Sequence, residues 1–305
     1  MESVRLPRFE RAPDIRPMQL TERDRDILRH AYRHRFLRSS HVVALTNGSP
    51  QQTLRRLQLL YHHGYLERPR AQIDYFHRGG SRPLIYGLGN KSAPLLPREK
   101  AVPYLDWQTK NRSVGRVFLE HALLVSDVLV RIELACRQGR VRLLAADEFL
   151  FPHQTRKRRE PIHWSVNFEN KSKLGLIPDR VFALEFPNQP VDRRRAFYFL
   201  EADRGTMPVM RGNLAQSSFY RKLLAYEATW TQNIHRTRLG LHRFRVLTVT
   251  TSAERVKHLI EACAQLKRGH GLFLFADADS FRRHSDPLSF PWHTAYPGKT
   301  ASLLG

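Results

Sequence analysis

Two segments decide the fold: Ile177-Pro-Asp-Arg-Val-Phe-Ala-Leu-Glu185 and Phe197-Tyr-Phe-Leu-Glu-Ala-Asp203. Their apolar content predicts two buried, neighbouring strands. Side chains alternate between the two faces of a strand, so we expect Glu201 and Asp203 to point the same way. Together with Asp179 they would form a pocket of carboxylate oxygens at the strand ends. Such oxygens are the ligands that Mg²⁺ or Mn²⁺ prefers.

The pattern after these strands predicts a helix over residues 213 to 231, in which Ser218, Lys222 and Tyr226 fall on one face. Lys222 would then lie beside the acidic pocket, where an ammonium group can neutralise a phosphate. Tyr226 is either a nucleophile or a hydrogen-bonding residue of the core. The predicted catalytic set is Asp179, Glu201, Asp203 and Lys222, and the predicted metal ligands are Asp179, Glu201 and Asp203.

Pro178-Asp179, followed about twenty residues later by Glu201-x-Asp203, resembles the metal-site signature of the PD-(D/E)xK nuclease superfamily. The resemblance implies a nuclease centre, with one departure. The third position is usually lysine and here is Asp203, so the role of the lysine would pass to Lys222. The alternative is that Asp179 is a turn residue and that Glu201 and Asp203 are ion-pair partners for arginines.

The composition favours a nucleic-acid partner. The chain has 305 residues, enough for two domains, and its 51 Lys and Arg against 28 Asp and Glu give a formal net charge of +23. Cys136 and Cys263 are the only cysteines, which excludes a disulfide framework. The sequence shows no apolar run of about eighteen residues and no signal core, so we expect a cytoplasmic protein without membrane contact.

The first part of the chain predicts a winged helix-turn-helix. After a flexible basic arm (residues 1–19), the domain would cover residues 20–90, with three helices and two short strands flanking a basic loop. The third helix would begin after Ser49-Pro50 and end before Gly64. It would enter the major groove of duplex DNA, although some winged helices bind only protein. The predicted DNA-contacting residues of this helix are Gln51, Gln52, Thr53, Arg55 and Arg56.

The loop of the wing would hold the DNA backbone through Arg70, Arg78 and Arg82. A second basic block lies in a predicted irregular stretch, residues 151–173. This basic block is close to Trp164 in the sequence, and we expect it to hold a phosphate backbone or to stack a base. The alternative is that it is a plain solvated loop. This block consists of Arg156, Lys157, Arg158 and Arg159.

A linker (residues 91–112) would lead to the second domain (residues 113–279), followed by a loosely ordered tail (residues 280–305). The predicted order of the second domain is helix, three strands, helix, strand, which is the αβββαβ order of a restriction-endonuclease-like core. The fold class is therefore mixed, α+β and α/β. On the first helix, Glu120 or Asp127 would add a carboxylate near the metal, and His121 is a structural histidine or a further site residue.

The chain as a whole resembles the replication-relaxation family of plasmids and integrative elements, which overlaps with the MobC-type relaxases. The resemblance covers roughly residues 20 to 276. Its most specific parts are Glu201-Ala-Asp-Arg-Gly-Thr206 and Lys222-Leu-Leu-Ala-Tyr226; further parts are Leu20 to Leu28, Thr53 to Leu57, Gly64 to Leu66, His121 to Val125 and Ile177 to Asp179. It implies a DNA-binding protein that acts in plasmid replication or transfer.

We therefore expect a double-stranded-DNA-binding protein of a mobile element, acting in replication initiation or in DNA relaxation and mobilisation by nicking with Mg²⁺ or Mn²⁺. The alternative is a non-catalytic accessory factor or transcriptional regulator with a degenerate nuclease-like domain. A third option is an RNA-binding protein. Other replication or relaxosome proteins are expected partners, and the oligomeric state stays open, with a dimer as one option.

Overall fold

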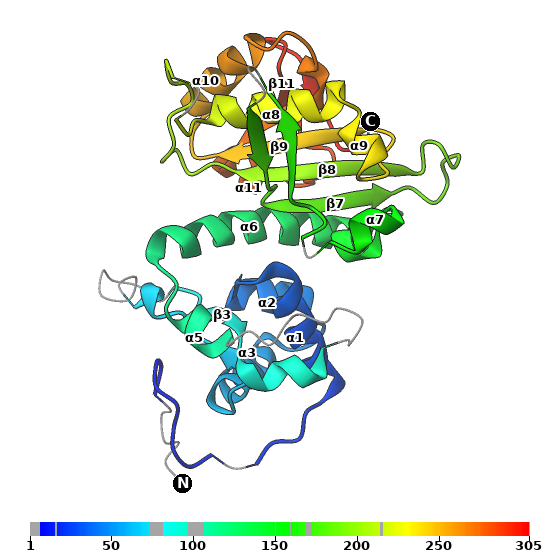
Figure 1. Ribbon diagram of the computed structural model, residues 1–305. Coiled ribbons are helices and arrows are strands. Elements are labelled where there is room, and N and C mark those ends of the chain that lie inside the picture. The colour runs from blue at the N-terminus through cyan, green and yellow to red at the C-terminus, as the bar shows by residue number, and fades with distance from the viewer. Residues whose placement is uncertain are drawn as a thin grey trace. The chain divides into compact units, whose positions relative to one another are not determined.

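The computed structural model describes residues 7–15, 17–73, 82–96, 107–149, 151–158, 160–168, 172–213 and 216–304. The chain divides into two compact units, Met1–Val130 and Arg131–Gly305, and the division falls within helix α6 (Arg116–Gln138). Both units mix helices and strands (Figure 1). In the part of the chain that the structure describes, no helix combines the length and the apolar character needed to cross a membrane.

The first unit contains a small antiparallel sheet with strand order β1-β3-β2. Its elements in chain order are α1 (Glu22–His34), β1 (Leu37–Arg38), α2 (Ser39–Leu45), α3 (Pro50–His62), β2 (Leu66–Glu67), β3 (Ile85–Leu88), α5 (Trp107–Arg112) and the first half of α6. Two short 3-10 helices, Arg70–Gln72 and Asn90–Leu95, lie in the connections. The two-residue strand β1 was not predicted, because a segment this short has no measurable periodicity.

Local sequence signals set the ends of these helices. Thr21 and Asp24 form a capping box at the start of α1. Pro50 opens α3, where its missing N–H costs nothing. Gly64 follows α3 with φ +83°, the left-handed conformation that glycine adopts without a steric penalty. Helix α3 thus begins and ends one residue earlier than predicted.

Residues on both sides of the predicted domain pack against it. The arm predicted to be flexible lies on the first unit in its described part: Arg11 Nη2 is 2.7 Å from Glu67 Oε2, and the Ala12 N–H donates to His62 Nδ1 at 3.2 Å. In the predicted linker, Ser92 and Asn111 are fully buried, and their side chains donate to backbone carbonyls of β2 and β3 or their flanks. The polar composition of this segment suggested exposure, but the Ser92 hydroxyl and the Asn111 amide N–H each have a backbone partner inside the unit.

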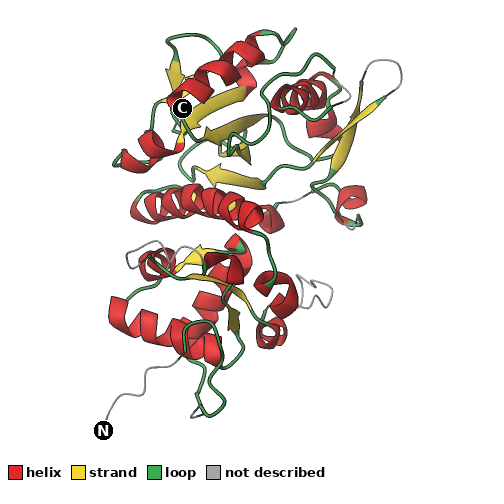
Figure 2. Ribbon diagram, turned by 90° about the vertical axis from the view of Figure 1, so that its left-hand side faces the viewer, coloured by secondary structure: helices red, strands yellow, loops and turns green. Residues whose placement is uncertain are grey.

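The second unit is built on a mixed seven-stranded sheet with the order β12-β11-β10-β9-β8-β7-β4 (Figure 2). Its strands are β4 (Arg142–Ala145), β7 (Arg180–Glu185), β8 (Arg195–Ala202), β9 (Phe244–Thr250), β10 (Phe273–Asp277), β11 (Trp292–Thr294) and β12 (Thr300–Ala301). Strands β8, β9 and β10 are parallel to one another, and the other neighbouring pairs are antiparallel.

Helices connect the parallel strands, as the geometry of a parallel crossover requires. The helices of this unit are α7 (His153–Arg156), α8 (Phe219–Thr231), α9 (Ile234–Thr237), α10 (Ala253–Ala264) and α11 (Ala278–Arg283). Helix α8 lies between β8 and β9 in sequence, and α10 lies between β9 and β10. Both helices pack on the core that includes Phe199, Phe244 and Phe273.

Two segments of this unit are more ordered than the sequence predicted. The stretch predicted to be irregular (residues 151–173) contains α7 and β5 (Trp164–Asn167), and β5 pairs antiparallel with β6 (Lys173–Leu176), which begins at the end of this stretch. The predicted loose tail contains most of α11 together with β11 and β12, and it buries Trp292 and Leu303. Single large apolar side chains hold the tail in place, and a single residue gives no periodic signal.

Candidate functional site

Strand β8 carries Glu201 near its carboxyl end, on the face that packs against α8. Phe199, two residues earlier on the same face, stacks on Tyr226 of α8 with ring centroids 5.7 Å apart. The register pairs Glu201 with Thr248 of β9. The alternation expected for β8 is therefore confirmed, and it directs the Glu201 carboxylate towards the helix.

The Glu201 carboxylate is fully buried and has two partners on α8. Lys222 Nζ donates to Oε2 at 2.5 Å, and the Tyr226 hydroxyl donates to Oε1 at 2.5 Å. The four-residue spacing of Lys222 and Tyr226 places both on the same helix face, as predicted. Ser218 has a different role, because its side chain caps the start of α8 by accepting the Arg221 N–H.

Burial dominates the electrostatics of this cluster. It raises the pKa of Glu201 from 4.5 to about 7, with Lys222 opposing and Asp179 adding to the shift. Burial lowers the pKa of Lys222, but the negative charges of Glu201 and Asp179 outweigh it, so that pKa is raised. Burial and the neighbouring Glu201 raise the pKa of Tyr226 well above its usual value. A tyrosine this buried and this weakly acidic positions Glu201 and is not an accessible nucleophile.

Asp179 belongs to the same cluster. It lies just before β7, and its Oδ2 accepts the N–H of Ala202 at 2.7 Å. Its charge contributes to the pKa shifts of Glu201, Lys222 and Tyr226. The structure thus brings together Asp179, Glu201 and Lys222 from positions more than forty residues apart.

Asp203 is arranged differently from the prediction. Its two carboxylate oxygens pair with Arg255 of α10 at 2.5 and 3.0 Å, and Oδ2 also accepts the Thr250 hydroxyl at 2.7 Å. The side chain is buried in an ion pair with Arg255, and its negative charge also acts on Lys222. Its predicted role as a metal ligand stays a prediction. The alternative stated above, an acid paired with arginine, holds for Asp203 and not for Glu201.

Sequence reasoning missed two residues next to these acids, Arg255 and Thr248. Arg255 lies in the first turn of α10, behind the capping Ser252, and an arginine at such a position has no distinctive sequence pattern. Thr248 is fully buried beside Glu201, and its Oγ1 lacks a hydrogen-bond partner among the described residues. A polar residue inside the apolar strand β9 is the signal that could have identified Thr248.

The acids and the histidine predicted from the first helix lie on the half of α6 that belongs to the first unit. Glu120 forms an ion pair with Arg116 at 2.8 Å, and Asp127 pairs with Arg38 and with His41. His121 is half-buried on the same helix. Their predicted roles at the acidic site stay predictions.

The predicted DNA-contacting helix is α3, and only part of its predicted set is exposed. Gln51, Gln52 and Arg55 are exposed. Thr53 is buried, which removes it from the set, because it packs under the helix against Thr46. Arg56 is held by Asp24, with Nε 2.8 Å from Oδ1, so its guanidinium group stabilises the unit.

Of the other predicted contacts, Arg70 and Arg82 are exposed, and Arg78 lies outside the described residues. In the second block Arg156, Lys157 and Arg158 are exposed, and Arg159 lies outside the described residues. Trp164 is buried and donates from Nε1 to Thr229 Oγ1 at 2.8 Å. It therefore cannot stack on a base as predicted.

Comparison with known proteins gives one positive finding. The model of a family described as replication-relaxation matches residues 28–243. Neither the curated proteins nor the solved structures contain a match to the chain. The family match covers more than half of the sequence and includes part of each unit, with α3, Asp179, Glu201 and Lys222. The resemblance inferred from the sequence is thereby confirmed, and the chain belongs to the replication-relaxation family.

Proposed function

We propose that this chain is a DNA-binding protein of a plasmid or another mobile element, and that it nicks duplex DNA with the help of Mg²⁺ or Mn²⁺. The family indicates a role in replication or relaxation of such elements. The formal net charge of +23 supports a polyanionic partner. Each unit supplies one part of the proposed activity.

The first unit is proposed to be a winged helix-turn-helix. Its order of helix, strand, two helices and two strands, with a three-stranded antiparallel sheet, supports this assignment. Helix α3 then takes the place of the recognition helix. Exposed Gln51, Gln52 and Arg55 would hydrogen-bond to base edges and phosphates of duplex DNA.

The second unit is proposed to be a PD-(D/E)xK nuclease-like domain. Strands β4, β7 and β8 form antiparallel neighbours, and α8 leads from β8 to the parallel strand β9. With α6, which enters the second unit at Arg131, taken as the first helix, this order supports the proposed αβββαβ core. The acidic cluster lies at the carboxyl end of β8 and the start of β7, the position of the metal site in the predicted signature.

The donor set fits one hard cation. Asp179 and Glu201 supply carboxylate oxygens, and Asp203 is excluded because Arg255 already neutralises it. The unpartnered hydroxyl of Thr248, buried beside Glu201, adds a neutral oxygen to the same place. A divalent ion held there would supply Lewis-acid polarisation of a phosphodiester oxygen.

Lys222 has the clearest role of its own. Its side chain is 31% exposed, whereas that of Glu201 is 1% exposed, so a phosphate can approach the ammonium group from solvent. There Lys222 would donate to a phosphate oxygen and stabilise negative charge that develops during cleavage. Tyr226 fixes the orientation of the Glu201 carboxylate through the hydrogen bond from its hydroxyl to Oε1.

One observation carries the proposal: Glu201 and Lys222 meet at 2.5 Å within the electrostatic reach of Asp179. The test is conversion of supercoiled plasmid to open circles in Mg²⁺ or Mn²⁺. We expect nicking by the wild type, loss of nicking in excess chelator, and a loss of at least about 100-fold in Glu201→Gln. Glu261→Gln, an exposed acid on α10, is the matched control and should nick normally.

A second candidate function is a non-catalytic accessory factor or regulator. The observation that favours it is the saturation of the acidic groups: both oxygens of Glu201 have donors, and both oxygens of Asp203 pair with Arg255. Strong, salt-dependent DNA binding that is equal with and without divalent metal, together with no nicking by the wild type in Mg²⁺ or Mn²⁺, would favour this function.

A further inference from the structure

A pocket of about 460 Å³ opens at the amino ends of β8 and β9, at the opposite end of these strands from Glu201. Arg195 and Glu201 are six residues apart on β8, which corresponds to about 20 Å along an extended strand. The register pairs Tyr198 with Arg245, so the floor of the pocket also lies on the strand face opposite to Glu201. This pocket is separate from the proposed nuclease centre.

Guanidinium groups dominate the charge of the pocket. It is lined by Arg193, Arg195, Arg243 and Arg245, with Asp192 as its one acidic residue. Asp192 lies 3.8 Å from Arg193, and both side chains are more than 70% exposed, so the pair is weak. Arg195 forms an ion pair with Glu185, with Nη2 2.9 Å from Oε1.

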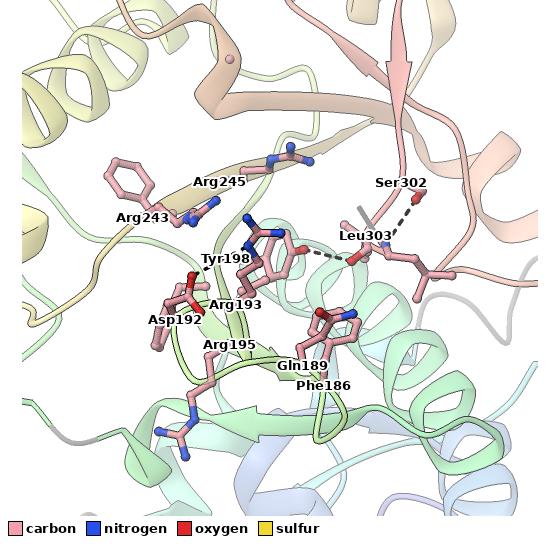
Figure 3. A pocket seen from close by; sticks show the side chains of 15 residues that line it. Phe186, Gln189, Asp192, Arg193, Arg195, Tyr198, Arg243, Arg245, Ser302 and Leu303 are labelled. Carbon is pink, nitrogen blue, oxygen red and sulfur yellow. Dashed lines mark hydrogen bonds and ion pairs between the residues drawn. The ribbon is translucent and has the colours of Figure 1, made fainter.

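Two of the arginines have no competing acid. The side chains of Arg243 and Arg245 form no ion pair with any residue in the described ranges, and Arg245 is half-buried in the pocket wall. Figure 3 shows Arg193 at the level of Tyr198, with a dashed line to Asp192, and Arg243 and Arg245 above them. Three guanidinium groups in one pocket, with Asp192 as a single, weakly paired carboxylate among its lining residues, match the planar, multidentate recognition of phosphate.

The remaining walls combine aromatic, apolar and polar side chains. The Tyr198 hydroxyl donates to the Leu303 carbonyl at 3.2 Å, which fixes the C-terminal segment as part of the floor. Phe186 and Gln189 line the side that faces the arginines (Figure 3). The volume exceeds that of a bare phosphate and falls in the range of small-ligand sites. An aromatic ring and an amide suit a planar, hydrogen-bonding base.

We propose that this pocket binds a phosphorylated nucleoside, with the phosphate on Arg193, Arg243 and Arg245 and the base against Phe186. The same chemistry is present in a free nucleotide and in the unpaired 5′-phosphorylated end of a DNA strand. The site is independent of metal binding at Glu201.

The test uses the full chain and deoxyadenosine 5′-monophosphate, with binding measured by calorimetry. Saturable binding is expected, with a loss of at least about 10-fold in Arg243→Ala/Arg245→Ala. The matched control, Arg283→Ala, removes an exposed arginine outside the pocket and should bind like the wild type. The conservative variant Phe186→Leu keeps the apolar volume and should still lose affinity, because the ring is absent. Unchanged thermal unfolding of the variants shows that they are folded.

Competition identifies the source of the ligand. The competitors are a single-stranded 12-mer with a 5′-phosphate and the same 12-mer without it. If the phosphorylated 12-mer displaces the mononucleotide at lower concentration, the pocket binds a strand end. If both displace it equally weakly, the pocket binds a free nucleotide. Inorganic phosphate that competes as well as the mononucleotide would overturn the proposal, and so would binding that is unchanged in the double variant. Glu201→Gln should bind the mononucleotide normally, which separates this proposal from the nuclease proposal.

Discussion

At the scale of single residues, Glu201 links the stability of the second unit to pH. Burial raises its pKa from 4.5 to about 7, so the folded chain holds a proton on Glu201 more tightly than the unfolded chain does. This group therefore makes the free energy of unfolding decrease as the pH rises from about 4.5 to about 7. The positive charge of Lys222 reduces the free-energy cost of ionising the buried Glu201 carboxylate.

Lys222→Met should be more destabilising at pH 8.5 than at pH 5.5. At the higher pH it leaves a buried carboxylate without its cation, which costs about 3 kcal/mol, whereas at the lower pH Glu201 is protonated. Urea unfolding at both pH values measures the difference. Lys257→Met, at an exposed position of α10, is the control. Equal destabilisation by Lys222→Met at the two pH values would contradict this account of Glu201.

Thr248→Val and Thr250→Val should have opposite effects on stability. The Thr248 hydroxyl is buried without a partner, so its removal should raise the free energy of unfolding by about 1 kcal/mol. The Thr250 hydroxyl donates to Asp203, so removal of this hydroxyl should lower the free energy of unfolding by about 1 kcal/mol. Denaturant unfolding without metal tests both. A destabilised Thr248→Val would show that its hydroxyl has a partner in the folded protein.

At the scale of elements, the sequence predicted long segments well and short ones poorly. Helix α3 lies within one residue of its predicted bounds. Helix α8 ends at Thr231 as predicted but begins at Phe219, six residues after the predicted start. Strands of two or three residues, such as β1 and β12, were missed because no period can be measured over so few positions. The pairing of Asp203 with Arg255 could not be predicted either, since it depends on how α10 packs on the sheet.

Helix α3 offers two neighbouring arginines with different roles. Arg55→Ala should lower the affinity for duplex DNA by about 10-fold and leave stability nearly unchanged, because Arg55 is exposed. Arg56→Ala should lower the free energy of unfolding by about 3 kcal/mol, because it leaves the buried Asp24 without its cation. Fluorescence anisotropy and urea unfolding measure the two effects. If Arg55→Ala binds DNA like the wild type, α3 is not the recognition helix.

The N-terminal segment should detach from the first unit in acid. Burial lowers the pKa of His62 from 6.5 to about 4, with the nearby Arg68 contributing. The unfolded chain therefore binds this proton more readily, and the stability that neutral His62 provides is lost as the pH falls from about 6.5 to about 4. Protonated Nδ1 also cannot accept the Ala12 N–H.

Amide NMR signals of residues 8–12 should accordingly move towards random-coil positions between pH 6.5 and pH 4. His62→Phe should show detached signals already at neutral pH, and His258→Gln, at an exposed position in the second unit, should behave like the wild type. Signals of residues 8–12 that stay unchanged down to pH 4 would exclude His62 as the switch.

At the scale of the whole molecule, the charge and the family point to nucleic acid, while the chemistry depends on one small cluster. The sequence predicted Asp179, Glu201 and Lys222 as a group, because strand alternation and helix spacing are local rules. The alternation of strand side chains also predicted Asp203 in this group, but in the folded chain Asp203 forms an ion pair with Arg255. The account therefore requires two acids and one lysine at the centre, with Asp203 outside it.

The most direct measurement compares the rates at which folded Asp179→Asn and Asp203→Asn nick supercoiled plasmid in Mg²⁺. The account predicts a loss of at least about 100-fold in Asp179→Asn and a rate within about 3-fold of the wild type in Asp203→Asn. The single carbonyl oxygen of that asparagine, placed where Oδ2 of Asp203 lies, can still accept from the Thr250 hydroxyl and from Arg255 Nε. Equal loss in both variants, nicking that survives Asp179→Asn, or a wild type that does not nick would contradict it.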